Sequence, residues 1–194
     1  MATIARLCLY CGSSRGRSPV YAAAATRLGT LIAEAGVTLV YGGGRVGLMG
    51  LAADAALAAK GRVIGVIPEL LRDREVGHTG ISERIIVASM HARKQRMFEL
   101  ADGFVVLPGG LGTLDETIEI ITWRQLGLHD KPIVIVDVEG YWSPLLGLVE
   151  HTIANGFTPA AARDFFRVVS SPDAVLPALA SLPEPAAKPQ SSRV

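Results

Sequence analysis

Apolar residues along this chain occur in two kinds of segment, which differ in length and in period. Short apolar runs with the length and composition of buried strands cover residues 4–9, 37–41, 62–68, 84–88, 103–107 and 133–138. Residues 165–169 form either a last strand or an extended segment. Longer segments, rich in helix-forming residues or with apolar positions at helical spacing, predict helices over about 19–35, 48–60, 90–101, 113–127, 141–155 and 171–182. Strands that alternate with helices in this way predict a parallel α/β sheet with right-handed crossovers.

Four segments that can carry ligand-binding groups directly follow predicted strands, at residues 12–14, 42–44, 90–94 and 109–113. In a parallel sheet the carboxyl ends of the strands share one edge, and ligands bind there near the reversal of strand order. We therefore expect backbone N–H donors, Arg93, Lys94 and Glu116 to meet at this edge, with Glu75 nearby. Such a pocket suits a nucleoside monophosphate.

The segment 105–116 reads as a strand, a glycine turn and the start of a helix. Its glycines let the backbone approach a ligand closely, and the helix N-terminus carries a partial positive charge. Together they form an anion site, most naturally for a phosphate, although turn chemistry alone explains the glycines equally well. The segment lacks Gly-Lys-Ser/Thr, so it is not a nucleoside-triphosphate P-loop. Thr113-x-x-Glu116 is also a capping box, which is the favoured role of Glu116 on spacing alone.

A second glycine run, Gly42-x-Gly44-x-x-Gly47, has the spacing of the dinucleotide fingerprint. It opens the second βα unit, whereas the fingerprint normally opens the first. The acidic residue that should follow about 20 residues later is also poorly placed, since Glu69 lies beyond Pro68. We therefore expect no nicotinamide cofactor.

Arg93 and Lys94 lie in the first turns of a predicted helix, where cations are mildly unfavourable. A local conflict of this kind is typical of a functional site, but a solvated basic face is slightly favoured by the sequence alone. The charged segment 69–81 is either a lid over the ligand or a solvent-exposed connection between two strands, and its periodicity does not decide between these.

Length and composition indicate one domain over residues 1–182, and 49% hydrophobic residues suffice for a sizeable core. Residues 183–194 hold three prolines and few apolar anchors, which predicts a disordered tail. A net charge of +1 gives no reason to expect a nucleic-acid or membrane partner. The N-terminus lacks a signal-peptide layout and there are only two cysteines, so we expect a cytoplasmic protein.

Cys8 and Cys11 have C-x-x-C spacing, but they fall in and just after a predicted strand rather than at a helix start. We therefore expect two unlinked thiols. The four histidines show no metal-ligand spacing with each other or with the cysteines, so we expect no metal site, although carboxylates could still bind a loosely held ion.

Two segments, 90–94 (MHARK) and 108–116 (PGGLGTLDE), resemble the paired signatures of the Lonely guy (LOG) family. Members of this family are cytokinin riboside 5′-monophosphate phosphoribohydrolases, formerly labelled possible lysine decarboxylases. The segments 11–14 (CGSS), 41–44 (YGGG) and 123–127 (WRQLG) are also similar to the family, and the resemblance extends over about residues 4–182.

The resemblance implies a Rossmann-like, doubly wound parallel sheet with helices on both faces, and a homodimer. It implies hydrolysis of the N-glycosidic bond of a nucleoside 5′-monophosphate to a free base and ribose 5-phosphate, without a cofactor. Carried over by motif, Arg93 and Glu116 form the catalytic pair. The implied phosphate-binding residues are Gly12, Ser13, Gly43, Gly44, Gly110, Gly112 and Thr113. The implied substrate-binding residues are Glu75, Met90, Arg93, Lys94, Gly110, Leu111, Gly112, Thr113, Leu114, Asp115, Glu116 and Thr122.

The chain departs from the family pattern at Ala92, where many members have Glu, and at Leu111, which is often aromatic in plant members. Neither position belongs to the implied chemistry, but both leave the preferred base open, N6-prenylated adenine or plain adenine.

Two other functional classes stay open. A non-catalytic nucleotide-binding module would use the same loops and release nucleotides intact. An amino-acid decarboxylase, suggested only by the old label, commonly needs pyridoxal phosphate on a lysine. Before the tail the chain has only Lys60, Lys94 and Lys131, and only Lys94 is expected near the pocket.

Overall fold

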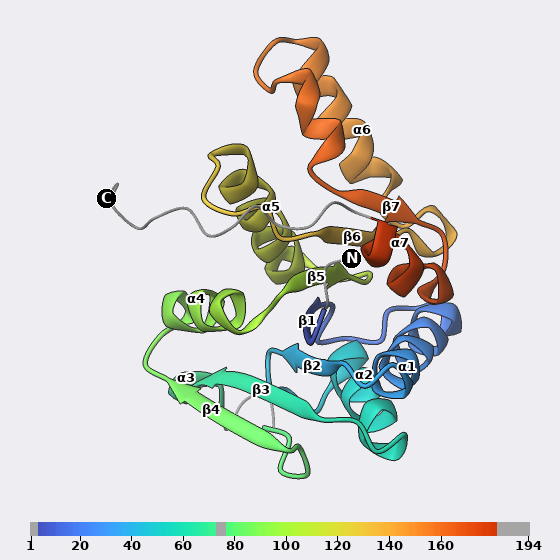
Figure 1. Cartoon of the computed structure of the whole chain (residues 1–194), viewed down its shortest axis with the longest axis vertical. Helices are drawn as coiled ribbons and strands as arrows, with labels where there is room; N and C mark the ends of the chain where they lie inside the picture. Colours follow the sequence, from blue (N-terminus) through green and yellow to red (C-terminus); the bar gives the residue numbers. More distant parts are fainter. Residues whose placement is uncertain (1–3, 73–76, 182–194) are drawn as a thin grey trace.

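The computed structural model of the chain describes residues 4–72 and 77–181, and a parallel β-sheet forms its centre (Figure 1). The strand order is β4-β3-β2-β1-β5-β6-β7, and every neighbouring pair is parallel. The strands are β1 (Arg6–Tyr10), β2 (Thr38–Tyr41), β3 (Val63–Pro68), β4 (Glu83–Val87), β5 (Gly103–Val106), β6 (Ile133–Val136) and β7 (Arg167–Val169). All the predicted strands and the parallel α/β class are confirmed.

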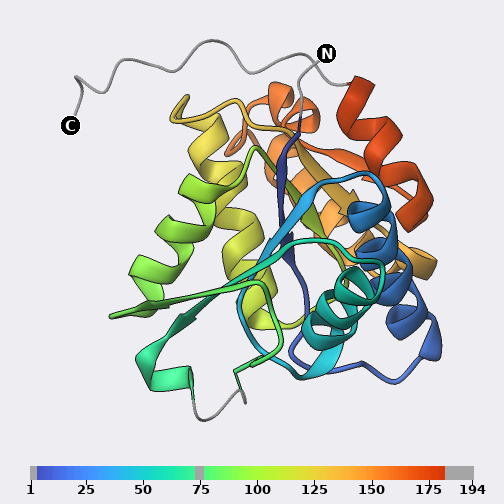
Figure 2. The ribbon, with the colours of Figure 1, turned by 60° about the horizontal axis from the view of Figure 1, so that its bottom comes forward.

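Helices cover both faces of the sheet, as Figures 1 and 2 show. One face carries α1 (Pro19–Glu34), α2 (Gly47–Ala58) and α7 (Val175–Ser181). The other carries α4 (Met90–Leu100), α5 (Leu111–Gln125) and α6 (Ser143–Ala154). Shorter turns are α3 (Glu69–Arg72), η1 (Val138–Gly140), η2 (Ala160–Asp164) and η3 (Pro172–Ala174). The doubly wound arrangement is therefore confirmed.

Apart from Arg6 and Thr38, which begin β1 and β2, the central strands are apolar because both of their faces are buried. In β1 the side chains of Leu7 and Leu9 belong to the core cluster under α1 and α2, whereas Cys8 and Tyr10 belong to the opposite cluster. This is the alternation that the two-residue period of a strand requires.

The reversal of strand order lies between β1 and β5. From β1 the chain moves outward through β2, β3 and β4, and then returns to place β5 on the other side of β1. Leu7 accordingly pairs with Leu39 of β2 on one side and with Gly103 of β5 on the other. The loops after β1 and β5 therefore face each other at the edge where α/β proteins bind ligands.

The capping-box explanation of Glu116 is wrong, because α5 begins at Leu111, two residues before Thr113. Its N-cap is Gly110, and no side chain caps it. Thr113 is a buried residue of the first turn, and its carbonyl accepts a hydrogen bond from the Thr117 hydroxyl at 2.6 Å. Glu116 is thus left for another role.

The segment between β3 and β4 begins with the single turn α3, and the question of a lid falls largely on residues 73–76, outside the described ranges. Beyond them, Gly77 forms an antiparallel bridge with Gly44, and the His78 N–H donates to the Gly43 carbonyl at 3.0 Å. The tail predicted at residues 183–194 also lies outside the described ranges. Among residues 4–72 and 77–181, no helix is long and apolar enough to cross a membrane.

His129 is buried after α5 and held in its neutral form. Its Nε2 lies 2.8 Å from the Ile120 carbonyl, and its Nδ1 accepts the Lys131 N–H at 3.1 Å. Because Nδ1 is an acceptor, Nε2 carries the proton. Burial lowers the pKa of His129 below its usual 6.5, although the hydrogen bond to Ile120 opposes this shift.

We expect this buried histidine to make the protein less stable in acid. The unfolded chain protonates His129 at its ordinary pKa near 6.5 and the folded chain only at lower pH. Between these pKa values the unfolded state binds more protons, so the free energy of unfolding falls as the pH drops below about 6.5. Melting temperatures measured from about pH 5.5 to 8 should depend less on pH in His129→Gln, which can keep both contacts. The exposed His151→Gln is the control, and equal pH dependence in wild type and His129→Gln would contradict the assignment.

Candidate active site

A cavity of about 200 Å³ lies at the carboxyl ends of the central strands, where the strand order reverses. We call it the switch-point cavity. Its lining residues are Leu9, Cys11, Gly12, Ser13, Gly42, Met49, Met90, Arg93, Met97, Gly110, Leu111, Gly112, Thr113, Asp115 and Glu116.

The loops after β1 and β5 are joined at the edge of this cavity. The Gly12 N–H donates to the Pro108 carbonyl at 3.0 Å, and the Gly12 carbonyl accepts from Leu48 at the start of α2, also at 3.0 Å. A Cβ at Gly109 would lie 2.1 Å from the Thr113 hydroxyl oxygen and 2.8 Å from the Gly12 nitrogen. Only glycine therefore permits this close approach.

The N-terminus of α5 opens into the cavity through Gly110 and Gly112. A Cβ on either residue would meet no heavy atom within 4 Å, so their backbones border open space. The first N–H groups of a helix have no acceptor within it, and its dipole favours an anion there. Tyr141 fixes the preceding turn, since its hydroxyl donates to the Gly109 carbonyl at 2.5 Å. These features fit a phosphate group.

Arg93 enters the cavity from the first turns of α4, whose N-cap Ser89 accepts the Ala92 N–H at 3.1 Å. Arg93 is only 5% exposed. One guanidinium nitrogen, Nη2, donates to the Gly42 carbonyl at 3.0 Å, and Nη1 lies 3.8 Å from the Met90 sulfur. Arg93 is therefore not part of a solvated basic face of the helix.

Glu116 faces the same cavity from the second turn of α5. Its negative charge and the positive charge of Arg93 both act on the thiol of Cys11. Burial raises the pKa of Cys11 well above its usual value, the Glu116 charge raises it further, and the Arg93 charge opposes this. Cys11 thus stays protonated and cannot serve as a thiolate nucleophile. Cys8 and Cys11 are both free, which confirms the prediction of unlinked thiols.

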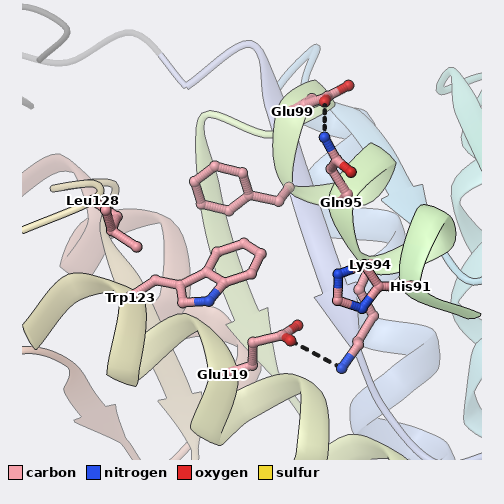
Figure 3. A pocket seen from close by; sticks show the side chains of 8 residues that line it. His91, Lys94, Gln95, Glu99, Glu119, Trp123 and Leu128 are labelled. Atoms are coloured by element: carbon pink, nitrogen blue, oxygen red, sulfur yellow. Dashed lines mark hydrogen bonds and ion pairs between the residues drawn. The ribbon is translucent and has the colours of Figure 1, made fainter. Parts of the chain in front are cut away.

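Lys94 faces a second cavity of about 330 Å³ between α4 and α5, which we call the α4–α5 cavity (Figure 3). Its ammonium nitrogen lies 3.1 Å from an Asp115 oxygen and 3.0 Å from a Glu119 oxygen. Burial lowers the pKa of Lys94, but the hydrogen bonds to Glu119 and Asp115 outweigh burial and raise the pKa above its usual value. Lys94 is therefore a charged ammonium that ties the two helices together.

Comparison with known proteins bears directly on this arrangement. A family profile described as "Possible lysine decarboxylase" matches residues 49–179. Cytokinin riboside 5′-monophosphate phosphoribohydrolase LOG1 of Arabidopsis thaliana is 46% identical over 169 residues, which cover 87% of this chain and 78% of that protein. The chain belongs to the LOG family. Cytokinin riboside 5′-monophosphate phosphoribohydrolase LOG of Oryza sativa subsp. japonica is 45% identical, over 87% of this chain and 69% of that protein.

Solved structures support the fold of this LOG-family chain. The molybdenum cofactor binding protein from the phototrophic bacterium Rippkaea orientalis superposes with a TM-score of 0.69, over 93% of this chain and 98% of that one. Its sequence identity is 22%, so the similarity concerns the fold alone.

The structure brings most of the residues implied by the LOG signatures to the switch-point cavity, but not all of them. Lys94 faces the α4–α5 cavity, half-buried Leu114 packs against the core, and Thr122 is exposed near the end of α5. Gly43 and Gly44 are buried against β3 and the segment after residue 76. Glu75 lies outside the described residues.

Four lining residues were missed from the sequence, Leu9, Cys11, Met49 and Met97, and Gly42 was expected at this edge only as part of the segment 42–44. Met97 carries a usable signal, because it lies four residues after Arg93 and therefore on the same helical face. Met49 carries no comparable signal, and the contact of Gly42 with Arg93 carries none either, since both depend on how α2 and β2 meet α4. Within residues 4–72 and 77–181, no three histidine, cysteine or carboxylate side chains are grouped to bind a metal ion.

Proposed function

We propose that this protein hydrolyses the N-glycosidic bond of cytokinin riboside 5′-monophosphates, and of AMP, to release the free base and ribose 5-phosphate. The curated relatives carry this activity in their names, at 45–46% identity. The observation that carries the proposal is the switch-point cavity, where the carboxylate of Glu116, the guanidinium of Arg93 and the N-terminus of α5 meet. A nucleoside monophosphate has a ribose ring for the carboxylate, phosphate or ribose oxygens for the guanidinium, and a phosphate for the helix N-terminus.

The chemistry follows from the charges of the reaction. As the bond between C1′ and the base nitrogen breaks, its electron pair leaves with the base, and positive charge develops on the ribose ring, as in glycoside hydrolysis. Glu116 stabilises that charge and orients the water whose oxygen bonds to C1′. A proton is lost from this water, and the departing base gains one. The backbone N–H groups of Gly110, Gly112 and Thr113 hold the phosphate.

Arg93 has two possible tasks that its position supports. It can bind the phosphate or ribose oxygens, or it can keep Glu116 ionised and oriented. Both tasks depend on a guanidinium that is buried and held by the Gly42 carbonyl.

The contacts of Lys94 argue against the amino-acid decarboxylase that the older label suggests. A pyridoxal-phosphate enzyme needs a lysine amine that can lose its proton and form a Schiff base. Lys94 instead lies in ion pairs with Asp115 and Glu119 that hold its pKa above the usual value. Hydrolysis consumes only the substrate and water, so the proposed reaction requires no cofactor.

We also propose that the protein is a cytoplasmic homodimer. The two free thiols fit a reducing compartment. Large apolar side chains are exposed on α5, α6 and the segments after them: Ile118, Leu126, Leu128, Leu148 and Phe157. All five lie on or just after helices of one face of the sheet, and we propose that a second copy of the chain covers them. Light scattering after size-exclusion chromatography is expected to give twice the chain mass, and a monomer would contradict the dimer.

The first test of the function is product analysis. The protein is incubated with AMP and, separately, with isopentenyladenosine monophosphate, and the products are separated by chromatography. Free base and ribose 5-phosphate would support the hydrolase, and the ratio of the two rates would identify the preferred base. Nucleotides that bind but are recovered intact would favour a non-catalytic nucleotide-binding module.

A further inference from the structure

We propose that Gly42 is a positioning residue for Arg93: the absence of a side chain at Gly42 determines where the guanidinium lies. The inference rests on the proposed function only in giving Arg93 a role in turnover. The contact between the two residues stands independently of that role.

The geometry is direct. Gly42 is buried at the carboxyl end of β2, and its carbonyl accepts the Arg93 Nη2–H at 3.0 Å. A Cβ on Gly42 would lie 1.9 Å from Nη2, 2.9 Å from Cζ of the same guanidinium and 3.3 Å from the Met49 sulfur. The guanidinium therefore occupies the volume that any other residue at position 42 would fill.

Backbone conformation does not explain the glycine at this position. Gly43, in the same loop, and Gly47, the first residue of α2, have φ of 78° and 63°, where a side chain is strained. Gly42 is not among the described glycines with positive φ, so its backbone suits any residue. The glycine run thus combines two requirements: Gly43 and Gly47 shape the loop, and Gly42 makes room for Arg93.

The predicted consequence of filling position 42 is displacement of the arginine rather than misfolding. The atoms that a Cβ would meet first belong to the end of a flexible side chain, not to the backbone. The guanidinium can move into the adjoining switch-point cavity, which has about 200 Å³ of space. It then loses the hydrogen bond to the Gly42 carbonyl and its place on the wall of the switch-point cavity.

Chemical labelling tests the position of Arg93 without relying on activity. Phenylglyoxal modifies exposed guanidinium groups, and peptide mass spectrometry can follow the reaction at Arg93. We expect labelling of Arg93 to be at least about fivefold faster in Gly42→Ala than in the wild type, because the group leaves its buried site. Equal labelling rates would overturn the inference.

A double-mutant cycle tests the consequence for turnover. With Arg93 present, Gly42→Ala is expected to lower kcat by at least about tenfold, because misplacing a reacting group by about 1 Å can cost about 10²-fold. With Arg93→Ala already in place, Gly42→Ala should change kcat by less than about twofold. Equal losses in both backgrounds would assign Gly42 a structural role that does not act through Arg93, and would overturn the inference.

Gly61→Ala is the matched control. A Cβ at Gly61 would lie 2.5 Å from the Ala33 Cβ and 3.0 Å from the Ala33 Cα, far from the cavity and against groups that cannot swing aside. We expect it to lower the melting temperature without changing kcat or the labelling of Arg93. If the wild type leaves nucleotides intact, the proposed function fails, and the labelling experiment still decides the position of Arg93.

Discussion

Replacing Glu116 with glutamine is expected to lower kcat by about 10²- to 10⁴-fold, with KM changed by no more than a few-fold. Glutamine has nearly the same shape as glutamate, so the cavity and the phosphate site at the start of α5 should be preserved. The neutral amide cannot stabilise positive charge on the ribose ring or accept a proton from water. Steady-state kinetics with chromatographic detection of the free base measures the effect.

Glu119→Gln is the control that makes this result specific. It is the same change on the same helix, three residues further along, and its carboxylate pairs with Lys94 in the α4–α5 cavity rather than facing the switch-point cavity. We expect its kcat to stay within about threefold of wild type, since a partly exposed ion pair contributes little. Turnover of Glu116→Gln at the wild-type level would mean that Glu116 is not catalytic.

The fold could be predicted almost completely because its signals are local and repeated. Each central strand is an apolar run flanked by turn residues, and that pattern arises wherever a strand is buried on both faces. The beginning of α5 was harder to predict. Threonine is a favoured N-cap residue, so Thr113-x-x-Glu116 reads as a capping box. The glycines before Thr113 let the helix begin at Leu111 instead, so this motif was misleading.

The sequence motifs identified most of the residues of the candidate site, but they did not show which side of α4 each residue faces. Motif matching placed Arg93 and Lys94 together, yet consecutive helical residues point about 100° apart. In α4 the face of Arg93 includes Met90 and Met97, both of which line the switch-point cavity, whereas Lys94 points to α5. Periodicity could have shown this separation.

Other placements depend on tertiary structure and carry no local signal. The glycine run after β2 cannot reveal that Gly42 faces Arg93 while Gly43 turns toward β3, because that difference depends on how β2, β3 and α4 pack. Thr122 could have been separated from Glu116 by counting residues, since six positions turn its side chain about 120° away and move it about 9 Å along the helix.

Arg93→Ala is expected to lower kcat/KM by about 10²-fold, which is typical when an oriented charged donor is removed from an active site. Arg93→Lys should recover only a small part of this loss, because an ammonium is a point charge without the planar fork of donors. Arg96→Ala, on the same helix, is the control. Its guanidinium is exposed and pairs with Glu99 at 3.2 Å, so we expect kcat/KM within about twofold of wild type.

The division of this loss between KM and kcat distinguishes the two tasks of Arg93. If the guanidinium binds the phosphate or ribose, KM should rise, and an inorganic phosphate competitor should bind more weakly to Arg93→Ala. If it orients Glu116, kcat alone should fall, and Arg93→Ala should have little further effect in Glu116→Gln. Unchanged kinetics in Arg93→Ala would contradict both tasks and would leave the buried arginine a structural part of the contact between α4 and β2.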